Sequence, residues 1–199
     1  MRTVFVPRAI ALLFAVAPLS LARRVLAQTG ESVRVRLRAD TVISGVRCAP
    51  TGRAYAVIHP NGSLDECPLA ADTVIGGHAL PRGTWLRLRE DRSLDGVWLP
   101  HDVELQRVPC KGTGYKGWSV RFSADVRLAS CYLAHDAVID SVPCRGAAFL
   151  TELRGSSQVT LYANGRLASC RAARSFSLNG RQYRAGDRIV LDDKDESAL

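Results

Sequence analysis

Residues 85–99 read WLRLREDRSLDGVWL, and this stretch decides the fold. Leu86 and Leu88 alternate with Trp85, Arg87 and Arg89, which is the period-2 pattern of a β-strand with one buried face. A turn position follows at residues 91–92, where the first copy of the pattern has Asn61-Gly62. Asn-Gly between apolar runs is the strongest short hairpin signal, because both central residues of a type I′ turn need positive φ. The stretch therefore predicts an antiparallel β-hairpin.

The same pattern of twenty positions recurs four times with no insertion inside it. Each copy is anchored by one leucine, namely Leu64, Leu94, Leu128 and Leu167. Apolar pairs precede the anchors by eight and six positions, as Ala56/Ile58, Leu86/Leu88, Val120/Phe122 and Val159/Leu161. Apolar pairs also follow the anchors by three and five positions, as Cys67/Leu69, Val97/Leu99, Cys131/Leu133 and Cys170/Ala172. A single apolar residue, which we call the closing residue, follows by eleven positions, as Ile75, Leu105, Ile139 and Leu178. Length varies only between copies, which is typical of a repeat architecture.

Details inside each copy refine this prediction. The apolar spacing of three and then two after the anchor changes parity once, and a β-bulge there would keep the side chains on one face. An Asp eight positions after the first three anchors, or Ser175 after the fourth, suits a corner where a side chain bonds backbone N–H groups. Half copies at residues 35–43 and 189–191 match the atypical ends of stacked units. The fold class is all-β, with stacked antiparallel β-hairpins in an elongated single-layer sheet or β-solenoid.

The first 27 residues resemble a secretory signal peptide. Arg2 and Arg8 precede an apolar run at residues 9–22, which is too short to span a membrane, and a small-residue site at residues 25–27 follows. Two alternatives remain open: cleavage after Ala22 instead of Ala27, and an uncleaved membrane anchor. The repeat domain then covers residues 28–191, and the acidic residues 192–199 form a disordered tail.

The charge balance argues against a nucleic-acid partner. The chain has 27 Lys and Arg against 19 Asp and Glu, a net charge of +8. Four of the arginines belong to residues 1–27, which contain no acid, so the exported chain keeps +4. Its basic residues are spread along the strands and form no concentrated stripe, which nucleic-acid binding would require. Solvated strand faces explain them better.

The six cysteines divide into two sets that share a position in the repeat. Cys48, Cys110 and Cys144 each lie five positions after a closing apolar residue, and Cys67, Cys131 and Cys170 each lie three positions after an anchor. In the copy without cysteine, Leu80 and Val97 replace both sets together. Positions gained or lost as a pair are expected to touch, which predicts Cys48–Cys67, Cys110–Cys131 and Cys144–Cys170 disulfides in an exported protein. Zinc and redox sites would need C-x2-C spacing, which is absent.

Four residues are candidates for a binding site, and no catalytic residues, metal ligands or cofactor are expected. Trp85 and Trp98 each precede an apolar strand residue, which places them on the face opposite the core; they form either a stacking platform for sugars or a second packed layer. His101 and His135 occupy the same position in consecutive copies. They form either a metal or ligand site or two solvent-facing turn residues. Asp40, Asp72, Asp102 and Asp136 favour turn capping over a calcium ladder, because one Asp in each copy supplies too few oxygens.

At residues 60–64 and 162–167 the chain resembles MORN-type repeats and their bacterial antitoxin-like variants, in which an apolar strand, an Asn-Gly turn and a Leu recur. The resemblance covers about residues 33–191. It departs from the family in its longer period, its paired cysteines and its few glycines. The family implies a sheet or solenoid used for contacts with proteins or membranes, without catalytic residues.

The function expected from these patterns is an exported, non-enzymatic repeat scaffold, periplasmic or secreted. Its partner would be a protein or a cell-envelope component, with no nucleic acid and no stable membrane insertion. The alternative is a carbohydrate- or peptidoglycan-binding module that uses Trp85 and Trp98. A hydrolase is a third class, and it would depend on His101 or Asp102 in a polar cleft.

Overall fold

The computed structural model describes residues 30–112, 119–147 and 158–193. The predicted signal peptide, most of the predicted tail and the third tryptophan of the chain, Trp118, lie outside these ranges. Within them, no helix has the length and apolar character needed to cross a membrane.

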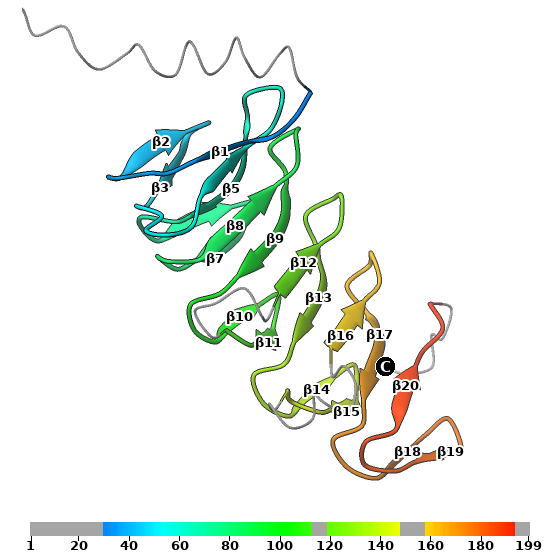
Figure 1. The fold of residues 1–199 in the computed structure, drawn as a ribbon. Helices are drawn as coiled ribbons and strands as arrows, with labels where there is room; N and C mark the ends of the chain where they lie inside the picture. Colours follow the sequence, from blue (N-terminus) through cyan, green and yellow to red (C-terminus); the bar gives the residue numbers. More distant parts are fainter. Residues whose placement is uncertain (1–29, 113–118, 148–157, 194–199) are drawn as a thin grey trace, which may run out of the picture.

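Ten short antiparallel strands form one long sheet, in the order β1-β4-β5-β8-β9-β12-β13-β16-β17-β20 (Figure 1). Its strands are β1 (Val33–Val35), β4 (Ala56–Ile58), β5 (Leu64–Pro68), β8 (Trp85–Leu88), β9 (Leu94–Trp98), β12 (Ser119–Phe122), β13 (Leu128–Tyr132), β16 (Gln158–Leu161), β17 (Leu167–Arg171) and β20 (Arg188–Val190). Each repeat copy contributes one hairpin, and the half copies contribute the two edge strands. The predicted all-β fold of stacked hairpins is confirmed.

Between successive sheet hairpins the chain forms a second, smaller hairpin of two three-residue strands. These are β2 (Thr41–Ile43) with β3 (Val46–Cys48), β6 (Thr73–Ile75) with β7 (His78–Leu80), β10 (Val103–Leu105) with β11 (Val108–Cys110), β14 (Ala137–Ile139) with β15 (Val142–Cys144), and β18 (Phe176–Leu178) with β19 (Arg181–Tyr183). Figure 1 shows these small hairpins following one another along one side of the sheet. Four of their first strands end at the apolar residues found eleven positions after the anchors, namely Ile75, Leu105, Ile139 and Leu178, and the second strands were not predicted.

The core lies between the sheet and the row of small hairpins. It joins sheet residues such as Leu86 and Val97 to small-hairpin residues such as Leu80 and Leu105 in one buried cluster. The disulfides cross this core as the repeat register predicts, with Cα–Cα distances of 5.8 Å for Cys48–Cys67, 5.7 Å for Cys110–Cys131 and 5.7 Å for Cys144–Cys170. Bonds of this kind persist in an oxidising, extracytoplasmic compartment.

The predicted β-bulge is present in every sheet hairpin. In β4–β5, Val57 pairs with Glu66 while Ile58 pairs with Leu64, so Asp65 is the extra residue. The same shift occurs in the other three hairpins. The bulge lets Leu64 and Cys67, three positions apart, both point into the core.

The predicted type I′ turn at the sheet hairpins is wrong. Pro60 and Asn61 have ordinary φ, Gly62 alone is left-handed at 83°, and Gly62 N donates to His59 O at 2.8 Å. Proline cannot adopt positive φ, so the loop is a three-residue turn closed by a left-handed residue. Turns with two left-handed residues occur instead in the small hairpins, including Gln106 and Arg107 at 49° and 66°.

Candidate functional site

Three of the junctions between a small hairpin and the sheet hairpin that follows it share the same four links. One is the disulfide, two are backbone hydrogen bonds, and the fourth joins the small-hairpin turn to the N–H of an anchor leucine. At the first junction these are Cys48–Cys67, Ala49 N to Pro68 O at 2.8 Å, Ala70 N to Arg47 O at 2.9 Å, and Leu64 N to Ser44 Oγ at 3.1 Å. The junctions after β11 and β15 repeat all four.

The junction after β7 can form none of these links. Leu80 and Val97 replace the two cysteines. Pro81 and Pro100 stand where the other junctions have their two N–H donors, and proline has no N–H. Gly76 stands where Ser44 supplies its hydroxyl, and glycine has no side chain. Five substitutions therefore remove every link at the same place.

A buried histidine holds this small hairpin by a different contact. His78 Nε2 lies 2.8 Å from Val126 O in the next sheet hairpin but one, and the His78 ring packs 4.7 Å from the Phe122 ring. Because a carbonyl only accepts, Nε2 donates. Gly76 also lies against Val126, since an added Cβ would meet its Cγ1 at 2.4 Å. The β6–β7 hairpin thus packs on a more distant unit.

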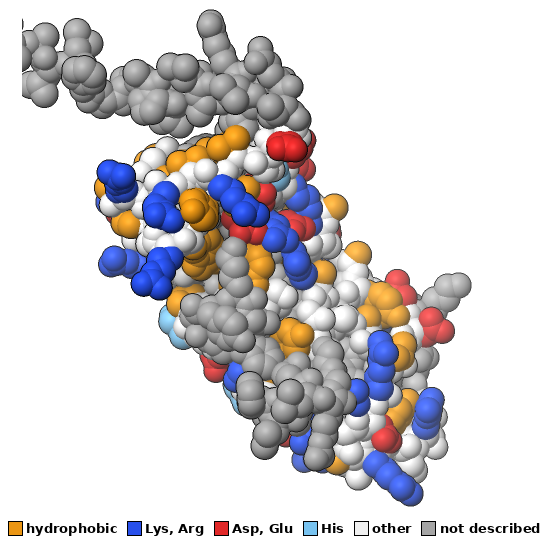
Figure 2. Space-filling view, viewed as in Figure 1, with side chains coloured by type: hydrophobic (Ala, Val, Ile, Leu, Met, Phe, Trp, Pro, Cys, Tyr) orange, Lys and Arg blue, Asp and Glu red, His pale blue; other side chains and the backbone are white. Residues whose placement is uncertain are grey.

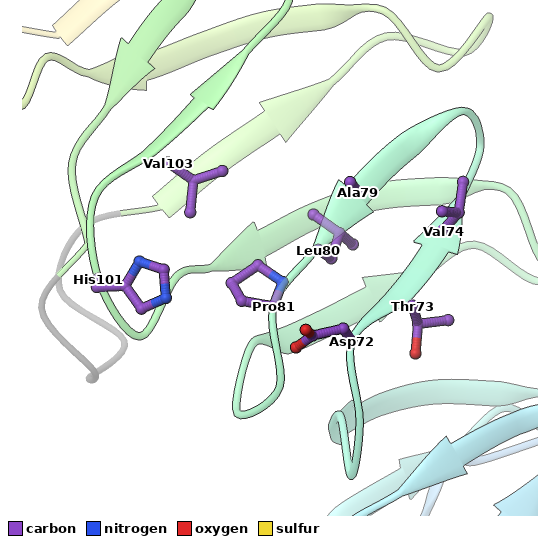
Figure 3. A pocket seen from close by; sticks show the side chains of 8 residues that line it. All are labelled: Asp72, Thr73, Val74, Ala79, Leu80, Pro81, His101 and Val103. Carbon is purple, nitrogen blue, oxygen red and sulfur yellow. The ribbon is translucent and has the colours of Figure 1, made fainter.

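A hollow of about 360 Å³ opens at this unlinked junction (Figure 3). Its apolar wall comes from Val74, Ala79, Leu80, Pro81 and Val103. Three polar side chains, those of Asp72, Thr73 and His101, complete the described lining. Leu80 and Pro81, which stand in place of a cysteine and an N–H donor at this junction, are part of the lining.

The two predicted histidines occupy equivalent exposed turns. His101 borders the hollow, and its Nδ1 lies 3.0 Å from the backbone oxygen of Asp102. His135 is exposed one unit further along. Beneath them, Gly112 and Gly146 touch the backbone so closely that a Cβ would lie 2.1 Å from His101 O and 2.6 Å from His135 C. Within the described ranges, no cluster of His, Cys, Asp and Glu could hold a metal ion.

Three of the four repeated aspartates accept a backbone N–H, as predicted, and the fourth, Asp40 of the N-terminal half copy, does not do so within the described residues. Asp72, Asp102 and Asp136 each accept the N–H of the residue ten positions later, at 2.7, 2.8 and 2.7 Å. The residue ten positions after Asp40 is Pro50, which has no N–H to donate. Asp40 instead forms an exposed ion pair with Arg47 at 3.1 Å.

The two predicted tryptophans lie opposite one another on the sheet face away from the core. Trp85 of β8 pairs with Trp98 of β9, and Pro68 and Ser119 extend the row to the neighbouring strands. Trp85 is half-buried, whereas Trp98 is only 7% exposed and has the Arg87 guanidinium 5.2 Å from its ring centroid. Trp85 is therefore the more accessible ring.

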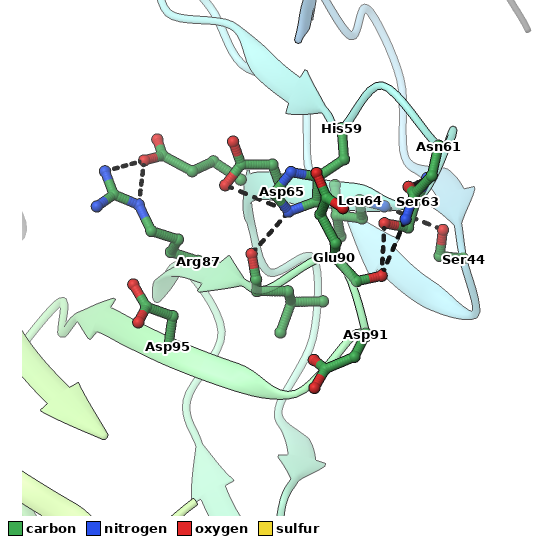
Figure 4. Close-up of polar contacts among 12 residues, drawn as sticks. Ser44, His59, Asn61, Ser63, Leu64, Asp65, Arg87, Glu90, Asp91 and Asp95 are labelled. Carbon is green, nitrogen blue, oxygen red and sulfur yellow. Dashed lines mark hydrogen bonds and ion pairs between the residues drawn. The ribbon is translucent and has the colours of Figure 1, made fainter. Parts of the chain in front are cut away.

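Charged side chains on the same face neutralise one another in the first half of the sheet (Figure 4). Arg87 bonds Glu66 through Nε at 2.8 Å, and at the next bulge Asp95 pairs with Arg89 and Arg121 at 3.2 and 3.1 Å. Figure 2 shows Lys and Arg distributed from one end of the visible face to the other.

The bulge residue Asp65 sits among these charges. Burial raises the pKa of its carboxyl above the ordinary value, and the Glu66 carboxylate adds to the rise. His59, whose Nε2 donates to Leu88 O and lies 3.9 Å from Asp65 Oδ1, opposes it. Asp65 is thus an ionisable group in an environment that disfavours its charge.

The outer side of the small-hairpin row carries a repeated exposed valine. Val42, Val74 and Val138 occupy the middle of β2, β6 and β14 and are 66%, 70% and 65% exposed, whereas Glu104 and Ser177 hold the same position in β10 and β18. We call these three residues the valine row. Sequence reasoning missed it, because the second row of hairpins was not recognised.

The fold and these surfaces define an all-β repeat protein whose hairpin units are stapled by disulfides. Its repeats are antiparallel hairpins that together build a long single sheet. Searches of family models, curated proteins and solved structures give no match to this chain.

Proposed function

We propose that the protein is an exported, non-enzymatic scaffold that binds a protein or cell-envelope component through the valine row. The observation that carries this proposal is the exposure of Val42, Val74 and Val138 at one repeated position. Single exposed apolar residues are ordinary, but three at the same position of different units suit a partner that contacts several units at once, with Glu104 between the second and third.

The compartment we propose is the periplasm or the cell exterior. The three disulfides support an oxidising location, and the signal-like residues 1–27 support export. Kinship with MORN-type repeats is part of the same proposal, and what supports it is the recurring hairpin with its Asn-Gly turn and anchor leucine. Such repeats are interaction surfaces in that family.

The test replaces the three valines by threonine. Valine also favours strands through its branched Cβ, and threonine keeps that branch while replacing one methyl by a hydroxyl. The matched control is Val190→Thr, since Val190 is equally exposed at 64% but lies on β20 of the sheet. Each immobilised protein, with its disulfides intact, is incubated with envelope and culture-fluid extracts of the producing cell.

We expect quantitative mass spectrometry to find a partner retained by wild type and by Val190→Thr. Losing three buried methyl contacts should weaken binding by about 2 kcal/mol, roughly thirtyfold. Equal retention by the triple variant would remove the valine row from the proposal.

A second candidate function is glycan binding at the outer sheet face. It is favoured by the adjacent Trp85 and Trp98, because aromatic rings on neighbouring strands can stack against sugars. Affinity electrophoresis in gels containing peptidoglycan fragments tests it. Trp85→Ala should abolish a retardation that His135→Ala leaves unchanged, and a wild type that migrates without retardation excludes this candidate.

A further inference from the structure

We propose that the hollow between the β6–β7 and β10–β11 hairpins binds an alkyl chain that ends in a cationic amine or guanidinium group. The hollow lies at the junction after β7, which lacks the disulfide, the two backbone hydrogen bonds and the turn contact of the other junctions, and Leu80 and Pro81 of that junction line it. The other three junctions have all four links, so this ligand site would occur once among the repeats.

The wall of the hollow suits an apolar stem. Val74, Ala79, Leu80, Pro81 and Val103 present only carbon atoms in their side chains. Leu80 is buried at the base and Val74 is strongly exposed at the rim. Figure 3 shows Val74 on β6, Ala79 and Leu80 on β7 and Val103 on β10, with Pro81 between Leu80 and His101. A chain of several methylenes would replace water along this wall, which is favourable.

The polar atoms at the rim are all hydrogen-bond acceptors. Thr73 Oγ1 uses its hydrogen to donate to Ala71 O at 2.9 Å, which leaves its lone pairs available. His101 Nδ1 must donate to the backbone oxygen of Asp102, so the neutral ring offers Nε2 as an acceptor. Asp72 accepts Arg82 N–H with Oδ1 only, which leaves Oδ2 available. A ligand that fits these atoms must carry donors.

The charge of the hollow selects a cationic donor over a neutral one. In the part of the chain that the structure describes, no basic side chain forms an ion pair with Asp72. An ammonium or guanidinium group would be the counter-ion that this carboxylate lacks, through a charge-assisted hydrogen bond. An anion would instead meet the carboxylate and two further acceptors. A volume of about 360 Å³ suits a small ligand of this kind.

This chemistry has two sources, a free alkylamine or the lysine or arginine side chain of a polypeptide. Val74 belongs both to the hollow and to the valine row. A small amine would bind inside the hollow, whereas a scaffold partner would contact several hairpins at once. Binding of such probes is therefore measured without any scaffold partner, and failure of either proposal leaves the other intact.

The experiment is isothermal titration of the disulfide-intact protein with hexylamine, hexanol and a blocked lysine-containing tripeptide. We expect saturable binding of hexylamine, with hexanol at least about tenfold weaker because it lacks the charge. Asp72→Asn keeps the oxygen that accepts Arg82 N–H but loses the charge, so it should weaken the binding of hexylamine by about tenfold. Asp102→Asn is the matched control, because Asp102 caps the equivalent turn through Gly112 N and does not line the hollow.

Binding of hexylamine alone assigns the site to free amines, and binding of the tripeptide at equal or higher affinity assigns it to a polypeptide side chain. The proposal is overturned if neither probe binds, if hexanol binds as well as hexylamine, or if Asp72→Asn and Asp102→Asn have equal effects.

Discussion

Leu80 and Val97 are both fully buried in the positions that bonded cysteines occupy in the three other copies. Two buried apolar side chains occupy these positions without a covalent bond, so they do not fix the distance between the two strands as a disulfide does. The loss of covalent linkage coincides with Pro81, Pro100 and Gly76, which remove the remaining links. One junction in the repeat array therefore lacks all four links, and its small hairpin is held instead by packing and by the His78–Val126 contact.

Replacing both residues by cysteine should create a fourth disulfide. In the Leu80→Cys/Val97→Cys variant, non-reducing peptide mass mapping is expected to find a cross-link between positions 80 and 97, beside the three native bonds. The chain-entropy estimate for such a loop is about 3 kcal/mol of added stability. Leu80→Cys alone is the control, and it should leave one free thiol. Two free thiols in the double variant would mean that this junction is wider than the others.

The reverse exchange tests how much of a disulfide's contribution is packing. Cys110→Ala/Cys131→Ala should lower the free energy of unfolding by about 2–5 kcal/mol, since it removes a cross-link in a buried site. Cys110→Leu/Cys131→Val copies the solution found at Leu80 and Val97 and should recover part of that loss by filling the cavity. Urea unfolding measures both. If the two double variants are equally stable, packing at this site contributes little.

The sequence predicted those parts of the fold that repeat in side-chain chemistry. The anchor leucines, the parity change at Asp65 and the paired absence of cysteine at Leu80 and Val97 recur at fixed spacing. Each reflects a physical requirement of a hairpin with one buried face. The sheet hairpins, the bulges and the disulfide pairs follow from them.

The second row of hairpins could not be predicted in the same way. Its strands have only three residues, too few for a clear alternation. The turn Gln106-Arg107 has neither Gly nor Asn, although both residues are left-handed, whereas Gly76-Gly77 and Asn179-Gly180 carry a hairpin signal that stands out only once the short strands beside them are known. The hollow could not be predicted from the sequence. Pro81 and Pro100 are significant because they lack an N–H where the other junctions have a donor, and this comparison requires the strand pairing.

Turn capping by the repeated aspartates gives a comparison between two equivalent positions. Asp102→Ala removes the acceptor for Gly112 N–H and should lower the free energy of unfolding by about 1 kcal/mol. Asp40→Ala removes only an exposed ion pair with Arg47, since Pro50 offers no N–H. It should change the free energy of unfolding by less than about 0.5 kcal/mol. Urea unfolding under non-reducing conditions measures both. Equal losses would show that capping is not the source of the effect.

Asp65 should make the stability of the protein depend on pH in an unusual direction. Because burial raises the pKa of this carboxyl in the folded state, the folded protein holds the proton more tightly than the unfolded chain does. Stability from this group therefore falls as pH rises through the interval between the ordinary Asp value of about 3.9 and the raised pKa. Above that interval the full cost of the buried charge is present.

Asp65→Asn removes this titration and keeps the shape of the side chain. We expect its thermal unfolding midpoint to exceed that of wild type at pH 7, with the difference shrinking as the pH falls through the same interval. Asp95→Asn changes the equivalent bulge residue, but Asp95 forms ion pairs with Arg89 and Arg121, so its midpoint at pH 7 should be lower than that of wild type. A lower midpoint for Asp65→Asn at pH 7 would mean that the attraction of His59 outweighs burial at this bulge.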